Sequence, residues 1–153
     1  MWVPPEVADP VVLHAPTRKS VSVFGAVRPS DGRLVADRLS PFNAETFQTF
    51  LGHLVRHRRA GRVQVVIVDN AKYHHSKALK PWLDAHRDVL RLDFLPPYSP
   101  DLNHQERVWK LTRRLVTHNS YFALLDALAE AVLRQFTLWD RPNETLRRLC
   151  AVI

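Results

Sequence analysis

Two neighbouring stretches near the start of the chain alternate apolar and polar side chains. Residues 21–27 and 33–39 have this strand pattern, and Pro-Ser-Asp-Gly occupies residues 29–32 between them. Proline presets φ and glycine tolerates a positive φ, so the pattern predicts a tight turn within a β-hairpin. Residues 1–19 contain four prolines, and we expect them to be extended and loop-like.

The central part of the chain combines helical periodicity with strand-like runs. Apolar residues recur at helical spacing over residues 47–55 behind Asn43, which predicts a capped helix. Residues 64–68 are almost purely apolar, and such a run predicts a strand buried on both faces of a sheet. A second helix is expected to begin after Ser76, and residues 90–95 alternate as a further strand.

The last third of the chain is predicted to be helical. The proline-rich segment 96–100 excludes regular structure, and a helical pattern begins near Asn103. Its apolar face consists of Val108, Leu111 and Leu115. A final helix is expected over residues 122–139, ended by Pro142. The order β-β-α-β-α-β-α-α predicts an α/β domain with helices on both faces of a mixed sheet.

Composition and charge narrow the class of partner. The 153 residues suit a single domain, and 22 Lys and Arg against 15 acids give a net charge of +7. This charge favours a polyanion, most commonly nucleic acid. A single cysteine, Cys150, excludes an internal disulfide and a cysteine-rich zinc site. Neither a membrane-spanning run nor a secretory signal is present, which makes a reducing cytosol the default compartment.

Two carboxylates are candidates for chemistry. Asp69 directly follows the apolar run 64–68, and Glu106 lies in the first turn of the next predicted helix. Taken singly, Asp69 is explained as a turn-capping residue, and Glu106 as part of a solvated stripe with Lys110 and Arg113. Taken together, a strand end and a neighbouring helix can bring two acids to one hard divalent cation, the kind of site that cleaves phosphodiesters.

Three segments carry a resemblance to a known family. They are Val68-Asp-Asn-Ala-Lys-Tyr-His74, Leu95-Pro-Pro-Tyr-Ser-Pro-Asp-Leu-Asn103, and Glu106 with Trp109. Together they resemble the signature of DDE-superfamily transposases, and more narrowly the bacterial insertion-sequence branch of the mariner superfamily. The spacing of Asp69 and Glu106 is also similar to that family's. With the weaker features around Trp2 and residues 21–51, the resemblance covers essentially the whole chain.

That resemblance implies a ribonuclease-H-like fold, Mg²⁺ (or Mn²⁺) ions, and cutting and joining of transposon-end DNA. Asp69 would be the second acid of the catalytic triad and Glu106 the third, both of them metal ligands. The residues expected to line the site are Asn70, His74, Tyr98, Ser99 and Asn103. The cations expected to contact DNA are Lys72, Lys110, Arg113 and Arg114. Terminal inverted repeats and target DNA would be the partners, at the bacterial nucleoid in the cytoplasm, and a homodimer is left open.

The sequence also departs from the family's pattern. Family members have Asn-Pro-Ile-Glu where this chain has Asn103-His-Gln-Glu106. The family's first acid precedes the residue matched by Trp2, and Asp9, Asp31 and Asp37 lie in a loop, a turn and a non-catalytic strand position. We therefore expect residues 1–153 to form a single, partial catalytic domain. It would lack the first strand, the first acid and the upstream helix-turn-helix region, and would show little or no cleavage alone.

Other interpretations are kept beside this one. A non-catalytic DNA-binding remnant of a transposase would explain the charge equally well, and it predicts salt-sensitive binding without Mg²⁺. A histidine-based hydrolase around Asp69, His74 and His75 is disfavoured, because adjacent histidines point in different directions on most backbones. The aromatic residues expected to serve packing rather than base stacking are Trp82, Trp109, Phe136 and Trp139.

Overall fold

The computed structural model describes residues 11–13, 20–118 and 120–151. Trp2, Asp9 and most of the predicted N-terminal loop lie outside these described residues. Residues 11–13 form a short strand, β1 (Val11–Leu13), where only loop was expected. It pairs antiparallel with the start of the next strand, with Val11 opposite Ser22.

The predicted hairpin is confirmed. Strand β2 (Ser20–Arg28) pairs antiparallel with β3 (Arg33–Arg38), in a register that runs from Val23 opposite Arg38 to Arg28 opposite Arg33. Gly32 takes a φ of 77° in the turn, as the sequence predicts. Its amide donates to the Arg28 carbonyl at 2.8 Å, which closes the hairpin.

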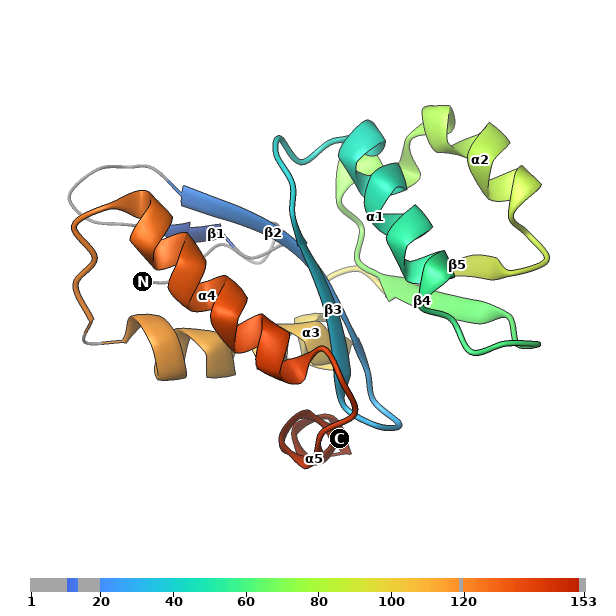
Figure 1. Ribbon diagram of the computed structural model, residues 1–153. Helices are drawn as coiled ribbons and strands as arrows, with labels where there is room; N and C mark the ends of the chain where they lie inside the picture. The colour runs from blue at the N-terminus through green and yellow to red at the C-terminus, as the bar shows by residue number, and fades with distance from the viewer. Residues whose placement is uncertain (1–10, 14–19, 119, 152–153) are drawn as a thin grey trace.

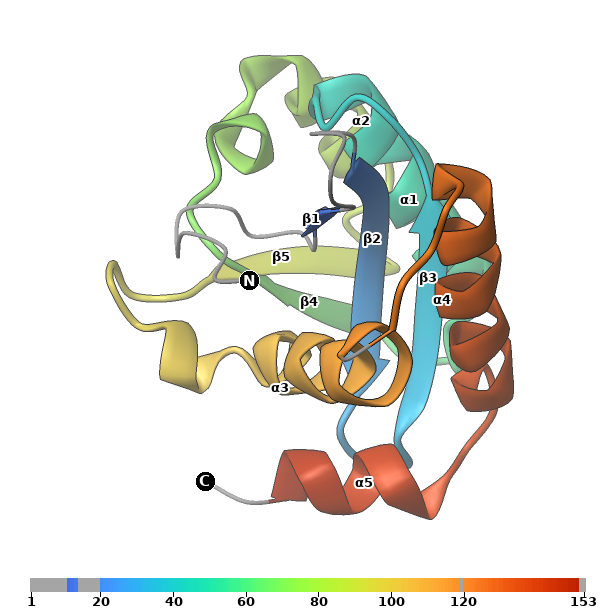
Figure 2. The ribbon, with the colours of Figure 1, turned by 90° about the vertical axis from the view of Figure 1, so that its left-hand side faces the viewer.

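A second sheet consists of two parallel strands. Strand β4 (Gln64–Val68) pairs with β5 (Leu90–Phe94) from Gln64 opposite Leu90 to Val68 opposite Phe94. Within the described ranges no backbone ladder joins this sheet to the β1–β2–β3 sheet. The strands of the two sheets cross in Figure 2. The strands therefore form two small sheets instead of the single mixed sheet that the sequence predicts.

Helices flank both sheets (Figure 1). They are α1 (Ala44–Arg56), α2 (Lys80–Ala85), α3 (His104–Thr112), α4 (Leu125–Trp139) and α5 (Glu144–Ala151). The 3₁₀ turns are Lys72–His75, Lys77–Leu79 and Pro100–Leu102, and a π-helical turn spans Arg113–Thr117. The predicted cap of α1 is confirmed, because the Asn43 side chain accepts from the Thr46 amide at 2.9 Å. None of the described helices has the length and apolarity needed to span a membrane.

Helix α5 was not predicted, because Pro142 reads as the end of helical structure and only a few residues follow it. It begins behind Asn143, whose side-chain oxygen accepts from the Leu146 amide at 2.9 Å. Leu146 and Cys150 are buried on its inner face. Cys150 therefore serves as a small apolar side chain, and burial raises the pKa of its thiol.

Strand β2 lies between two hydrophobic cores, because its side chains point alternately to its two faces. Val21 and Val23 belong to one core with α3, α4 and α5, whereas Phe24 belongs to the other with α1 and Val68 of β4. The predicted packing role of the aromatic residues is confirmed for Trp109, Phe136 and Trp139, which are buried in the first core. Trp82 is half-buried and stacks on His86 at 3.9 Å between ring centroids.

Two burial predictions are wrong. Strand β4 is not buried on both faces, because Val65 and Ile67 remain 43 % and 59 % exposed on the face turned away from α1. Leu115 does not continue the apolar face of α3 and is 55 % exposed. Its helical phase changes because α3 ends at Thr112, and the π-helical turn that follows rotates Leu115 away from Val108.

Candidate active site

Asp69 is held rigidly at the end of β4. Its Oδ1 accepts a hydrogen bond from the Ala71 amide at 3.1 Å, which fixes the turn after the strand. The Nδ1 atom of His74 hydrogen-bonds to the Asp69 carbonyl oxygen at 3.1 Å and lies 3.0 Å from the same Oδ1. The Asp69 side chain is 25 % exposed and that of His74 only 5 %. A buried histidine therefore orients a carboxylate that still reaches solvent.

The 3₁₀ turn Lys72–His75 places two adjacent histidines differently, as predicted. The His74 ring packs against Phe47 and Tyr73, with 4.4 Å between centroids in each pair. The His75 ring instead stacks on Phe94 at 4.1 Å, and its Nε2 contacts the Asn70 side-chain oxygen at 3.0 Å. Only His74 thus faces Asp69.

The loop after β5 is tied to the end of β4 before it enters α3. The Leu95 amide donates to the Val68 carbonyl at 2.8 Å, and the Asn70 side chain donates to the Leu95 carbonyl at 2.9 Å. Asn103 then caps α3, because its side-chain oxygen accepts from the Gln105 amide at 3.1 Å. These bonds fix the path from the end of β4 to α3, whose first turn carries Glu106.

Several neighbours act on the carboxyl group of Glu106. The pKa of Glu106 is raised, first because its carboxyl is buried. The charge of Asp69 raises the pKa further, while Arg113 and, more weakly, Lys110 lower it. The Glu106 carboxyl is therefore within reach of the charge of Asp69 and of cations on α3 and the following turn.

The structure distributes the other predicted residues unevenly. Asp69, His74 and Asn103 line one cavity. Asn70 is exposed and ties two loops together. The Ser99 hydroxyl donates to the Pro97 carbonyl at 3.2 Å. Tyr98 takes a left-handed φ of 56° and projects fully into solvent. The exposed predicted cations are Lys72, Lys110 and Arg114, whereas Arg113 is half-buried.

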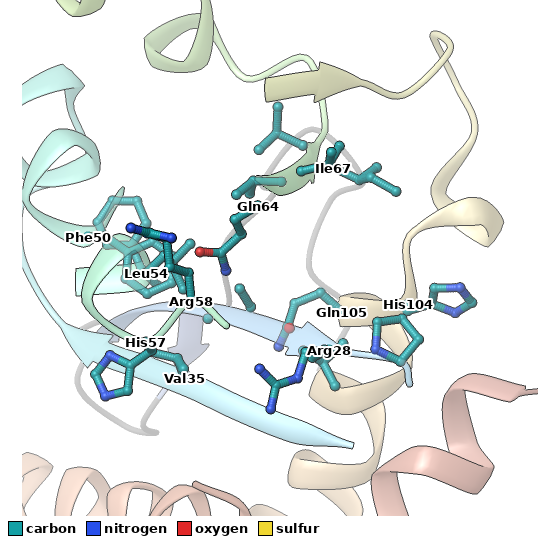
Figure 3. Close-up of a pocket in the computed structure, with 18 of the residues that line it drawn as sticks. Arg28, Val35, Phe50, Leu54, His57, Arg58, Gln64, Ile67, His104 and Gln105 are labelled. Atoms are coloured by element: carbon teal, nitrogen blue, oxygen red, sulfur yellow. The ribbon is translucent and has the colours of Figure 1, made fainter. Parts of the chain in front are cut away.

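The cavity beside Asp69 has a volume of about 340 Å³ and lies between β2 and β4 (Figure 3). Its lining also includes Gln64, Gln105 and a group of arginines that the sequence analysis did not assign to any site. The arginines are Arg28, Arg33, Arg58, Arg59 and Arg62. The basic residues that follow α1, Arg58, Arg59 and Arg62, could have indicated a site in the sequence. They are equally well explained as the cationic residues that often occur at the C-terminus of a helix.

The donors that face this region fit a hard divalent cation only in part. Carboxylate oxygens suit Mg²⁺, which usually keeps several waters and takes one or two protein carboxylates plus substrate phosphate. Among the described residues, no group of three or more His, Cys, Asp or Glu side chains is placed to hold a metal. Asp31 and Asp37 are engaged elsewhere, Asp31 with the Arg28 Nε–H at 2.9 Å and Asp37 with His53 at 2.6 Å.

Comparison with known proteins assigns the chain to a family. A family model described as DDE superfamily endonuclease matches residues 2–129. The chain belongs to the DDE superfamily endonucleases. This membership confirms the resemblance carried by the segments around Asp69 and Glu106.

Curated relatives of this DDE-family chain come from bacteria. The "Uncharacterized protein y4pE/y4sA" of Sinorhizobium fredii is 36 % identical over 91 residues, which are 60 % of this chain and 64 % of that protein. The "Insertion element IS630 uncharacterized 39 kDa protein" of Shigella sonnei is 28 % identical over 95 residues, 62 % of this chain and 27 % of that protein. The chain thus spans less than two thirds of either relative.

A solved structure shows the same fold. The catalytic domain of Mos1 mariner transposase superposes with a TM-score of 0.68 and 17 % identity, covering 94 % of this chain and 72 % of that domain. The predicted ribonuclease-H-like α/β class is thereby confirmed, in the form of two small sheets with flanking helices.

Proposed function

We propose that Asp69 and Glu106 bind Mg²⁺ or Mn²⁺ and that this DDE-family chain acts on the ends of a DNA transposon. One observation carries the proposal: burial and then the charge of Asp69 raise the pKa of Glu106, against the lowering charge of Arg113. The positive charges of Arg113 and Lys110 offset part of the repulsion between the two carboxylates, of which Glu106 is half-buried. A divalent cation would remove that repulsion.

Each neighbouring residue has a defined part in this proposal. His74 is a positioning residue, because its buried ring hydrogen-bonds to the Asp69 carbonyl oxygen and lies 3.0 Å from Asp69 Oδ1. Asn103 positions Glu106 by capping α3. When bound, the cation would activate the attacking hydroxyl and stabilise the leaving oxygen of a phosphodiester. The chain itself contributes a rigid strand end for Asp69 and a capped helix start for Glu106, which would hold the two carboxylates in fixed positions.

Cations next to the acids support a DNA backbone as the substrate. Lys110 and Arg113 are close enough to Glu106 to lower its pKa, and Lys72 follows Asp69 in the next turn. Contacts from such side chains to phosphate oxygens position a duplex without reading its sequence. The names of the relatives, an insertion element and a mariner transposase, point to transposon terminal repeats and target DNA as the duplexes bound. Such a substrate places the protein at the nucleoid.

We further infer that the described residues cut DNA slowly. Two carboxylates hold divalent cations more weakly than three, and they leave more uncompensated charge on the phosphate. A nicking assay on labelled inverted-repeat DNA, with and without Mg²⁺, tests the function. We expect Mg²⁺ to strengthen binding to the repeat DNA, with little product, and Asp69→Asn to abolish that strengthening. Salt-sensitive binding that ignores Mg²⁺ would instead identify a non-catalytic DNA-binding protein.

A further inference from the structure

Two histidines lie one helical turn apart at the C-terminal end of α1. His53 belongs to the last turn of the helix, and His57 is its C-cap. Residues four apart share one face of a helix, and the two rings have 5.1 Å between their centroids. Two imidazoles on one tetrahedral ion have ring centres about 5 Å apart, because each centre lies about 3.2 Å from the ion. The pair therefore has the separation that a shared transition-metal ion requires.

The Nδ1 atom of each ring already contacts an oxygen acceptor. His53 Nδ1 lies 2.7 Å and 2.6 Å from the two carboxylate oxygens of Asp37. His57 Nδ1 lies 2.8 Å from the His53 carbonyl oxygen. These oxygens only accept, so each Nδ1 carries the hydrogen, and Nε2 of the neutral ring keeps its lone pair. Neither Nε2 atom has a hydrogen-bond partner among the described residues, which leaves both for an ion.

Asp37 supplies the outer contact that metal-binding histidines usually have. Such a histidine gives its second N–H group to a carboxylate or a carbonyl, which fixes the ring and makes the binding nitrogen more basic. Asp37 does this for His53 from β3, and its side chain is only 17 % exposed against 35 % for His53. An ion on His53 would therefore be linked through Asp37 to β3 as well as to the end of α1.

Both rings line a second pocket, of about 180 Å³, between α1, β3 and the end of α4. Its lining includes neither Asp69 nor Glu106. Asp140, the C-cap of α4, also lines it, but its Oδ1 accepts from the Arg33 guanidinium at 3.3 Å. In the part of the chain that the structure describes, no third His, Cys, Asp or Glu is placed to complete a metal site. Water would therefore fill the remaining positions of an ion held by the two rings.

We propose that His53 and His57 together bind a divalent transition-metal ion such as Zn²⁺ through their Nε2 atoms, with Asp37 as a positioning residue. Imidazole nitrogen suits Zn²⁺, Ni²⁺ and Cu²⁺, whereas carboxylate oxygen suits Mg²⁺. This site thus differs in kind from the one proposed at Asp69 and Glu106, and it does not rest on the proposed function. A bound ion stabilises the folded chain, because the unfolded chain does not hold the two rings together.

Isothermal titration calorimetry of the full chain with ZnCl₂, in excess Mg²⁺, measures the site. We expect one Zn²⁺ per chain, binding lost in His53→Ala and in His57→Ala, and binding about tenfold weaker in Asp37→Asn, which lacks the outer carboxylate. His86→Ala is the matched control and should bind as the wild type does. The Nδ1 atom of His86 also contacts a carbonyl oxygen four residues earlier, that of Trp82 at 2.8 Å, but no second histidine lies one turn away.

Two further readouts locate the ion. Zn²⁺ at ten times its Kd should raise Tm by about 3–6 °C. In imidazole ¹⁵N spectra of the wild type, which need no variant to fold, Zn²⁺ should move the Nε2 signals of His53 and His57 alone. Absence of Zn²⁺ binding, an equal loss in His86→Ala, or a shift at His74 in place of the pair would overturn the proposal. So would binding lost in Asp69→Asn, whereas failure of Mg²⁺ to bind at Asp69 would contradict only the proposed function.

Discussion

At the scale of single residues, the arrangement around Asp69 combines a solvent-accessible carboxylate with a buried support. The sequence placed Asp69 at a strand end and Glu106 at a helix start, because both positions follow from local hydrophobic periodicity. The hydrogen bond from His74 to Asp69 could not be predicted from the residues alone. It depends on the 3₁₀ turn Lys72–His75, which returns the ring to the strand end, and short turns of this kind leave no periodic signal.

Replacing Glu106 with Gln tests the repulsion between the acids. Burial and the charge of Asp69 raise the pKa of Glu106, so the ionised form is less stable in the folded chain than in the unfolded chain. The folded protein therefore gains stability as the pH falls through this raised pKa. We expect Glu106→Gln to raise Tm at neutral pH without metal, and to remove the Tm increase caused by Mg²⁺.

Thermal unfolding followed by circular dichroism across pH measures both effects. Glu130→Gln, an exposed position on α4, is the control and should leave both the Tm and its response to Mg²⁺ unchanged. An unchanged or lower Tm for Glu106→Gln would show that the charge of Glu106 is not under strain in the fold.

Replacing His74 tests its role in positioning Asp69. His74→Ala removes a buried ring and its hydrogen bond to Asp69, and we expect it to lower the free energy of unfolding by about 2 kcal/mol. Mn²⁺ affinity, measured by isothermal titration calorimetry below the unfolding temperature, should also fall. His75→Ala, which removes an exposed ring stacked on Phe94, should change stability and affinity much less. Equal effects of the two variants would contradict the assignment.

At the scale of secondary-structure elements, the hairpin, α1 and both parallel strands were predictable, because each carries a strong periodic pattern or cap. The wrong or missing predictions fall where the chain departs from regular helical periodicity. The π-helical turn Arg113–Thr117 rotates Leu115 out of the core, and α5 is short and follows a proline. Local sequence patterns do not reveal how two elements approach each other. The next two predictions test such tertiary features at Gly25 and Asp31.

Gly25 tests the contact between β2 and α3. A Cβ at Gly25 would lie 2.4 Å from Cη2 of the buried Trp109, so β2 and α3 can approach only where this side chain is absent. We expect Gly25→Ala to lower the free energy of unfolding in urea by about 1–3 kcal/mol, as overpacking does. At Gly52 in α1 the nearest atom would be 4.0 Å away. Gly52→Ala should therefore raise stability by about 0.5–1 kcal/mol, and a loss there equal to that at Gly25 would contradict the packing described.

Asp31 tests the electrostatics of the hairpin turn. Its hydrogen bond with Arg28 lowers the pKa of Asp31 from 3.8 to about 2, with Arg33 and Arg59 contributing. Because the folded pKa is the lower one, the stabilisation is present above pH 3.8 and is lost as the pH falls towards 2. We expect Asp31→Asn to lower the free energy of unfolding by about 1 kcal/mol at neutral pH, a value that allows for solvent screening of this surface group.

The difference in unfolding free energy between Asp31→Asn and the wild type should disappear near pH 2, because the wild-type carboxyl is then also protonated. Urea unfolding at neutral pH and near pH 2 measures it, with the exposed Asp84→Asn as control. A cost that stays constant with pH would assign the effect to the shape of the turn rather than to charge.

At the scale of the whole molecule, the chain folds around two cores that β2 separates, and Asp69 lines the cavity between β2 and β4. The family resemblance predicted the fold class, and the comparisons confirmed it. The division into two sheets, and the cavity between them, were beyond the reach of local patterns. A run such as residues 64–68 shows that a strand is apolar, but not which neighbour covers each of its edges and faces.

The proposed function depends on Asp69 and Glu106 converging on one divalent cation. Fe²⁺ substituted for Mg²⁺ generates hydroxyl radicals with ascorbate and peroxide, and these cut the polypeptide next to the bound ion. Mass spectrometry of the fragments should find cleavage near both residue 69 and residue 106, lost at both places in either Asp69→Asn or Glu106→Gln. Cleavage near only one of the two residues, or cleavage that survives both substitutions, would contradict a shared site.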